Sequence, residues 1–313
     1  MTLIAALAAA FVIQLFSSQI NPYYYNVIVK IGINIILAVS LNLINGYTGQ
    51  FSLGHAGFMA VGAYTSAAVT MFVGPKVLPH GTGPVFDLAP LILFLVALLI
   101  GGLAAAIAGA LVGAPSLRLK GDYLAIVTLG FGEIIRVIVR NIDSLGGALG
   151  LNGIPAYTNF FWLAAVAIVC IYVVLTMVHS SYGRGFLAVR DDEVAAEAMG
   201  LNTTRYKIVA FVVGAFFAGM AGGLYGHDTL SIDPKGFDYN RSIEIVVMVI
   251  VGGMGNTLGV IAAAVLLTLL PEFLRSTDKY RMVLYSFLLI VLMLTRPQGL
   301  FNWRRRVKPV VSA

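Results

Sequence analysis

The chain has 313 residues, of which 59% are hydrophobic and only 11% are charged. Soluble domains carry about 25% charged residues, so this composition excludes an ordinary soluble enzyme and indicates a polytopic membrane protein. A net charge of +6 could suggest nucleic acid, but the basic residues gather in short loops and at the C-terminus. Orientation in a membrane explains that placement better, and we expect no nucleic-acid partner.

Apolar segments follow one another along the whole chain. A helix needs about 20 apolar residues to cross the hydrocarbon core of a bilayer, and segments of about 10–14 can be re-entrant instead. The sequence therefore predicts an all-α protein with about ten (eight to ten) transmembrane or re-entrant helices, in one domain over residues 1–313. The expected helices lie near 3–16, 26–45, 56–73, 90–113, 122–140, 160–178, 207–226, 242–254, 256–271 and 281–295.

The two ends of the chain indicate how it is oriented. The segment 3–16 could be a signal peptide, but no Lys or Arg precedes its apolar run, so we interpret it as a retained helix. The segment 296–313 is rich in Arg and Lys, which predicts a cytoplasmic C-terminal tail. With ten spans, the N-terminus and the loop at 179–206 are then cytoplasmic as well.

Small residues recur at helical spacing in two of the expected spans. Gly109 and Gly113 are four residues apart, and so are Gly219 and Gly223. Such spacing lets helix backbones approach closely in lipid. We expect packing within one subunit, with a subunit interface as the alternative.

Two polar, Gly-rich stretches interrupt the apolar pattern. "GYTGQFSLG" (46–54) and "GGMGNTLG" (252–259) each follow one apolar segment and precede another. Paired Gly-interrupted segments point to a transport site, although simple Gly-rich turns between helices would give the same pattern.

Polar side chains in and near these stretches suit the lining of a path for a small solute, although each alone could be a helix–helix hydrogen bonder. Glutamates within spans are functional candidates by default. Glu133 could instead pair with Arg136 three residues on, and Glu244 could be a helix N-terminal charge. The candidate pathway residues are Asn42, Asn45, Gln50, Ser52, His55, Thr128, Glu133, Glu244 and Asn256.

The loop 179–206 is the longest polar stretch, and its middle has the pattern of a short capped helix. Asp191 is a good N-cap and Gly200 a suitable C-terminal glycine. Apolar residues at 194, 195, 198 and 201 fall on one face. A helix of about ten residues is too short to be stable alone, so it must pack on the protein's own helix ends or on a partner subunit.

Several kinds of catalytic site are missing from the sequence. It contains no phosphate-binding G-x-x-x-x-G-K-[ST] loop, no Gly-x-Ser-x-Gly motif, and no His/Cys cluster with metal-ligand spacing. The one cysteine, Cys170, lies in an apolar segment. We therefore expect a transport subunit and not an enzyme, with no metal or cofactor bound by this chain.

Two long stretches resemble LivM-like permease subunits of bacterial ABC importers for branched-chain amino acids. They are "LNLINGYTGQFSLGHAGFMAVGAY" (41–64) and "GRGFLAVRDDEVAAEAMGLNTTRYKIVAFVVGAFFAGMAGGLYG" (183–226). The segment at 247–266 and the ending "RPQGL" (296–300) fit the same family. The resemblance covers most of the chain from about residue 30.

This resemblance implies a multi-pass protein of the bacterial inner membrane that works by alternating access. It implies four partners besides membrane lipid: a homologous, LivH-like second permease, two cytoplasmic ATPases that carry ATP and Mg²⁺, and a periplasmic binding protein. It further implies that a helix in 183–206 couples the permease to an ATPase. The expected coupling residues are Arg190, Asp191, Asp192, Glu193, Ala195, Ala196, Glu197, Met199 and Gly200.

The coupling segment departs from the family pattern at one position. Many importer permeases carry E-A-A-x-x-x-G there, whereas this chain has Val194 before the two alanines and its acid one residue earlier, at Glu193. The partner of that acid is therefore open. Two alternatives to branched-chain amino-acid import also stay open, namely an ABC permease for urea, short amides or other small solutes, and a stand-alone secondary transporter.

Overall fold

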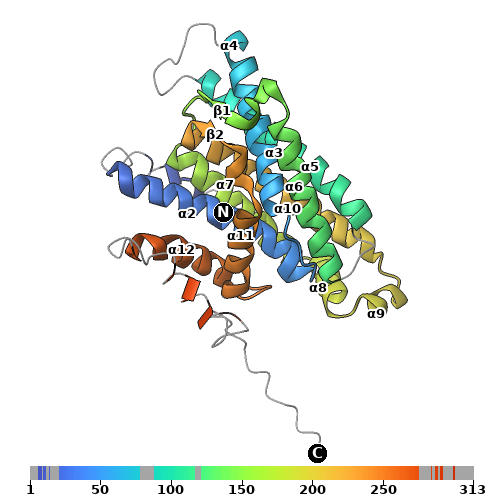
Figure 1. Cartoon of the computed structure of the whole chain (residues 1–313). Helices are drawn as coiled ribbons and strands as arrows, with labels where there is room; N and C mark the ends of the chain where they lie inside the picture. The colour runs from blue at the N-terminus through green and yellow to red at the C-terminus, as the bar shows by residue number, and fades with distance from the viewer. Residues whose placement is uncertain are drawn as a thin grey trace, which may run out of the picture.

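The computed structural model describes residues 21–77, 88–116 and 121–274, together with isolated positions near both ends of the chain. Most of the segment 3–16, most of the segment 281–295 and the basic tail 296–313 therefore lie outside the described residues. Within the described ranges the chain is almost entirely helical (Figure 1), which confirms the all-α class.

The long helices follow the apolar segments of the sequence. Five of the described helical segments are long and apolar enough to cross a membrane: Pro22–Tyr47, His55–Lys76, Ala89–Ala114, Phe160–His179 and Thr203–Thr229. They correspond to α2 (Pro22–Asn42) with the π-helical turn η2 (Leu43–Tyr47), α3 (His55–Ala68) with η3 (Val69–Val73) and α4 (Gly74–Val77), α5 (Leu88–Ser116), α7 (Phe160–His179) and α10 (Thr203–Thr229).

Three further helices match expected spans but are shorter or less apolar. α6 (Asp122–Arg140) is amphipathic, with Glu133 and Arg136 among apolar residues. α11 (Tyr239–Gly252) and α12 (Thr257–Phe273) are separated by a short turn. Both have fewer than the about 20 residues that a bilayer crossing needs.

The core forms where α3, α5 and α10 pack closely, and glycines make that approach possible. A Cβ on Gly62 would collide with the backbone of Gly219, and one on Gly109 would lie 2.6 Å from the Cβ of Ala215. Small side chains let backbones approach this closely in lipid. The small-residue stripes of α5 and α10 thus pack against each other within one chain, as the spacing predicted.

The bundle has two different ends (Figure 1). At one end lie two short helices of the 179–206 loop, α8 (Ser181–Asp191) and α9 (Glu193–Ala198). At the other end lies a cap, which we define as residues 141–159 and 230–238. It holds the 3-10 turns η4 (Asp143–Leu145), η5 (Gly147–Leu149) and η6 (Pro234–Phe237), and strand β1 (Leu151–Asn152) paired antiparallel with β2 (Ser231–Ile232).

Candidate functional site

The first Gly-rich stretch forms a buried, non-helical connection between α2 and α3. Residues 48–54 leave the helix after η2, and Gly49 adopts φ +68°, which favours glycine. Asn45 and Ser52 hold the connection by two hydrogen bonds: Asn45 Nδ2 donates to the Ser52 carbonyl at 3.4 Å, and Ser52 N donates to Asn45 Oδ1 at 3.2 Å. We call residues 43–54 break 1.

The second stretch turns at residues 253–256, which we call break 2, and lies against break 1. Gly253 and Gly255 both have positive φ, and Asn256 caps α12 by accepting from Gly259 N. Gly255 N donates to Asn42 Oδ1 at 2.9 Å. The hydroxyls of Tyr47 and Thr257 are 2.8 Å apart. The two stretches that resemble each other in sequence therefore meet in space.

Two more candidate residues support break 1 from its sides. His55 begins α3, is fully buried, and its Nε2 lies 2.9 Å from Ser40 Oγ on α2. Thr128 on α6 accepts a hydrogen bond from Leu53 N at 3.0 Å. These contacts join α3 to α2 and break 1 to α6.

Several polar atoms around break 1 nevertheless have no hydrogen-bond partner among the described residues. They belong to side chains that are at least nine-tenths buried. The atoms are Asn42 Nδ2, both amide atoms of Gln50, Ser52 Oγ and His55 Nδ1, with Ser66 Oγ further along α3. Buried polar groups are rarely left unpaired, so this cluster is suited to interact with water or a polar solute.

The two candidate glutamates pair with arginines on their own helices. Glu133 Oε2 lies 2.6 Å from Arg136 on α6, and Glu244 Oε2 lies 2.9 Å from Arg241 on α11. Both are i,i+3 pairs, and all four side chains are partly exposed. Glu133 thus forms the pair that its spacing allowed, and neither carboxylate makes a described contact with the two breaks.

The 179–206 loop contains two helices, which corrects the expected single helix of about ten residues. α8 ends at Asp191, and α9 begins after Asp192. The N-cap of α9 is Asp192, whose Oδ1 accepts from Val194 N and Ala195 N, and not Asp191. The chain bends here because Asp192 has an extended backbone. Gly200, with φ +82°, ends the segment as expected.

The acids of α9 turn toward the protein itself. Glu193 pairs with Lys207 at the start of α10 at 2.6 Å, and Glu197 accepts from the Thr203 hydroxyl at 2.6 Å. Ala196 is the buried residue of this helix. The apolar residues at 194, 195, 198 and 201 therefore do not pack inward as one face, since Val194 is 68% exposed. Met199, the C-cap residue of α9, is 83% exposed.

Arg190 bonds break 1 and lies near Gly255 of break 2, an arrangement that spacing along the sequence does not predict. Its Nη1 donates to the Gly46 carbonyl at 3.4 Å, and its Nε and Nη2 donate to Asp191. A Cβ on Gly49 would lie 2.7 Å from the Arg190 side chain, and one on Gly255 would lie 3.1 Å from Nη1. Glycine leaves room for the Cα–Cγ part of Arg190 at position 49 and for its guanidinium at position 255.

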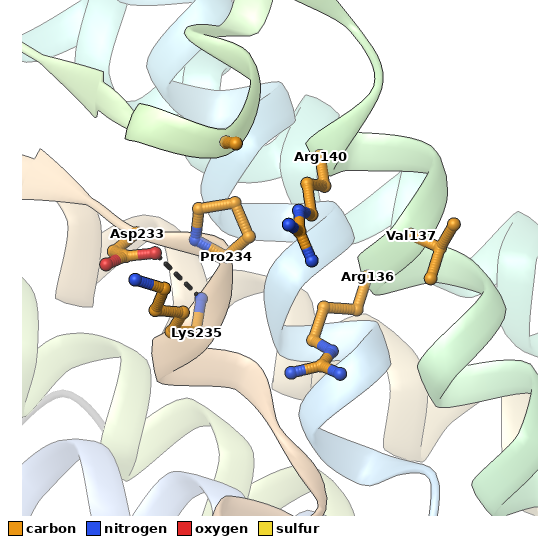
Figure 2. Close-up of a pocket in the computed structure, with 7 residues that line it drawn as sticks. Arg136, Val137, Arg140, Asp233, Pro234 and Lys235 are labelled. Carbon is orange, nitrogen blue, oxygen red and sulfur yellow. Dashed lines mark hydrogen bonds between the residues drawn. The ribbon is translucent and has the colours of Figure 1, made fainter.

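A separate pocket of about 120 Å³ lies at the cap end (Figure 2). The end of α6 contributes Arg136, Val137 and Arg140 to its wall, η5 contributes Ala148, and η6 with its N-cap residue contributes Asp233, Pro234 and Lys235. No group of three or more His, Cys, Asp or Glu side chains that could hold a metal ion occurs among the described residues.

The fold and the paired breaks define the class as an all-α, multi-pass membrane protein with polar helix interruptions in its interior. Residues 23–294 match the family model described as the permease component of the branched-chain amino acid transport system. The chain belongs to this family of membrane permeases. This match confirms the resemblance carried by residues 41–64 and 183–226.

Individual relatives agree with the family match. The chain is 35% identical over 314 aligned residues to the high-affinity branched-chain amino acid transport system permease protein LivM of Salmonella typhimurium, and equally to LivM of Escherichia coli; each alignment covers 89% of this chain and 68% of the relative. LivH of Escherichia coli is 29% identical over 127 residues, 40% of this chain and 41% of LivH. No solved structure matches.

Proposed function

We propose that this chain is a transmembrane subunit of an ATP-driven ABC importer of the bacterial inner membrane, moving branched-chain amino acids from a periplasmic binding protein to the cytoplasm by alternating access. ATP is hydrolysed on two separate cytoplasmic subunits that carry ATP and Mg²⁺, and a homologous permease completes the membrane core. The observation that carries the proposal is the match of residues 23–294 to the permease family, and the hydrogen bond from Arg190 to the Gly46 carbonyl links the 179–206 loop to break 1.

The outer surface of α9 fits the role of an ATPase contact. Val194 and Met199 are large apolar residues that face solvent on a helix of six residues. So short a helix is held by its surroundings and not by its own hydrogen bonds. Glu193 and Glu197 fix α9 to the start of α10, so Val194 and Met199 are held in defined positions for a partner.

Arg190 connects the surface of α9 and α8 to the breaks in the interior of the protein. α8 packs against α7 and α10, so a partner that moves α9 also moves the end of α8. Arg190 would then shift against the Gly46 carbonyl and the glycines of both breaks. Tightly packed elements move as units and not by gradual deformation, so this shift would rearrange the two breaks together.

The unpartnered polar atoms of Asn42, Gln50, Ser52 and His55 fit a state in which the pathway at the breaks is closed. Opening would let water or the zwitterionic part of an amino acid supply the missing hydrogen bonds. Irregular backbone at membrane depth is tolerated where it is buried in protein or lines a water-filled cavity, and breaks 1 and 2 meet that condition in both states.

The decisive experiment reconstitutes the chain with its second permease and ATPases, supplies leucine-loaded binding protein, and measures ATP hydrolysis and leucine uptake. Loaded binding protein is expected to stimulate hydrolysis several-fold. Uptake of leucine by this chain alone, driven by an ion gradient, would instead support a secondary transporter. Stimulation only by a urea- or amide-loaded binding protein would change the substrate.

Substituting Val194 and Met199 with Glu tests the docking face. Charges on an apolar contact must be desolvated, so we expect the ATPase subunits to be lost from the purified complex while the permease pair remains. Leu149→Glu is the matched control, because Leu149 is 89% exposed at the cap end. Normal ATPase retention in the doubly substituted complex would rule out α9 as the docking element.

Arg190→Ala tests the link to the breaks. We expect the complex to assemble and hydrolyse ATP, with leucine uptake per ATP hydrolysed reduced about tenfold, in the range of an allosteric coupling energy of about 1–3 kcal/mol. Arg184→Ala is the control on the same helix, since the Arg184 side chain is exposed and bonds only Ser181 Oγ among the described residues. An unchanged ratio of uptake to hydrolysis would contradict the role of Arg190.

A further inference from the structure

The cap pocket is enclosed by two segments that are far apart in sequence (Figure 2). The end of α6 supplies Arg136 and Arg140, and the start of η6 supplies Lys235. Pairing of β1 with β2 holds the two parts of the cap together. Gly150 lets the backbones approach, because a Cβ there would collide with the Ile232 carbonyl oxygen.

Some charges of the pocket are fixed and others are free. Glu133 holds Arg136 at 2.6 Å, and Asp233 Oδ1 accepts from Lys235 N at 2.9 Å. Among the described residues, the Arg140 guanidinium and the Lys235 ammonium form no ion pair. Positive charge therefore remains in excess after Glu133 and Asp233 are both counted, and Arg140 and Lys235 line the same hollow of about 120 Å³ from opposite sides.

The position of the pocket indicates which partner can reach it. It lies at the end of the bundle opposite α8 and α9 (Figure 1). If α9 meets the ATPases, the cap faces the periplasm. We propose that this pocket receives a carboxylate side chain, Asp or Glu, of the binding protein that delivers the amino acid. This inference rests on the proposed function and assigns Arg140 and Lys235 to partner recognition.

Charge favours this occupant over the free substrate. A branched-chain amino acid is a zwitterion with no net charge, whereas the pocket has an excess of positive charge. An Arg guanidinium forms paired hydrogen bonds with a carboxylate, and Arg and Lys on a docking surface speed association with an acidic partner and make it dependent on salt. An anionic lipid headgroup carries a negative charge like that of a carboxylate side chain. The test therefore also compares neutral lipid with anionic lipid.

The experiment uses the complete permease–ATPase complex in nanodiscs of neutral phosphatidylcholine, with the variants Arg140→Glu and Lys235→Glu. Lys76→Glu is the matched control, because Lys76 is exposed at the cap end of α3–α4 and does not line the pocket. The dissociation constant of the leucine-loaded binding protein is measured at several salt concentrations, together with ATP hydrolysis in its presence and absence.

Each pocket variant is expected to weaken binding about tenfold or more and to flatten its salt dependence. Basal ATP hydrolysis and the Lys76→Glu complex should be unaffected. Surface Asp and Glu residues of the binding protein are then changed to Lys one at a time. At least one of these binding-protein variants should bind the Arg140→Glu complex more tightly than the unchanged binding protein does.

Several outcomes would overturn the assignment. One is an unchanged affinity in both pocket variants while the wild-type complex is still stimulated, which leaves the proposed function intact. Another is a loss of leucine binding to the complex without any loss of binding-protein affinity. A third is a defect that appears only when phosphatidylglycerol replaces phosphatidylcholine. Failure of any loaded binding protein to bind the wild-type complex would overturn both this assignment and the proposed function.

Discussion

Gly46 occupies the point where the two breaks touch. A Cβ added there would collide with Asn42 Oδ1 and with Gly255 N, the two atoms whose hydrogen bond joins the end of α2 to break 2. Gly46→Ala is therefore expected to destabilise the protein by about 1–3 kcal/mol, as overpacking does, and to lower its thermal unfolding midpoint in detergent.

Gly130→Ala is the matched control for this prediction. Gly130 lies in α6, and an added Cβ there meets nothing within 4 Å. Because Ala is a better helix former than Gly by about 1 kcal/mol, this variant should be as stable as the original or slightly more stable. Equal unfolding midpoints for the two variants would show that the contact between the breaks can accommodate a Cβ at position 46.

At the scale of single residues, the sequence predicted which side chains gather at the breaks but not what they do there. Asn42 and Asn45 were recognisable as polar residues beside Gly-rich turns. The bond of Asn45 to Ser52 depends on the local fold of break 1, and the bond of Asn42 to Gly255 depends on how break 2 lies against the end of α2. Spacing along one chain carries no information on a contact between residues 144 positions apart, which is why the sequence predicts Arg190 on a coupling helix and not beside the Gly46 carbonyl.

At the scale of elements, the 179–206 loop shows why a capping pattern alone was insufficient. Asp191 and Asp192 are both good N-caps, and the sequence does not distinguish them. The choice is made by Arg190, whose guanidinium bonds Asp191 and leaves Asp192 to cap α9. In contrast, the bounds of α7 agree with the expected span 160–178 to within one residue, while α10 begins at Thr203, four residues before the expected start, because Asn202 caps it there.

The ion pair between Glu193 and Lys207 is the element-scale feature most open to test. Lys207 is only 5% exposed, so Glu193→Ala leaves a buried ammonium without this partner, which is expected to cost about 3–5 kcal/mol. The double variant Glu193→Ala/Lys207→Met removes the buried charge as well and should recover most of that loss. Free energies of unfolding from denaturant titration in detergent give the comparison.

Two further substitutions separate the ion pair from the cap of α9. Asp192→Asn keeps a side-chain oxygen for Val194 N and Ala195 N and should be nearly neutral, while Asp192→Ala should cost about 0.5–2 kcal/mol. If the double variant is no more stable than Glu193→Ala alone, the destabilisation comes from the backbone of α9 and not from the stranded ammonium of Lys207.

At the scale of the whole molecule, α5 and α6 present different outer faces. Leu103, Ile107 and Leu111 form an exposed, wholly apolar stripe on α5, as a lipid-facing helix does. α6 exposes Ile134 and Val137 beside the Glu133–Arg136 pair. Ionisable groups at membrane depth cost at least about 2.5 kcal/mol each when they face lipid, so this face of α6 should be covered by protein or by a water-filled pathway.

That contrast predicts where the second permease binds. With the native Cys170 replaced by Ala, single cysteines at Ile134 or Val137 on α6 should cross-link to single cysteines in the homologous permease when a short bifunctional thiol reagent is added to the assembled complex. Cysteines at Leu103 or Ile107 on α5 should not, because their stripe faces lipid. Cross-linking yield on denaturing gels is the measurement, and leucine uptake before cross-linking verifies that each complex is functional. Efficient cross-linking from the α5 positions, with none from α6, would place the partner on the opposite face and leave the Glu133–Arg136 pair to be shielded in some other way.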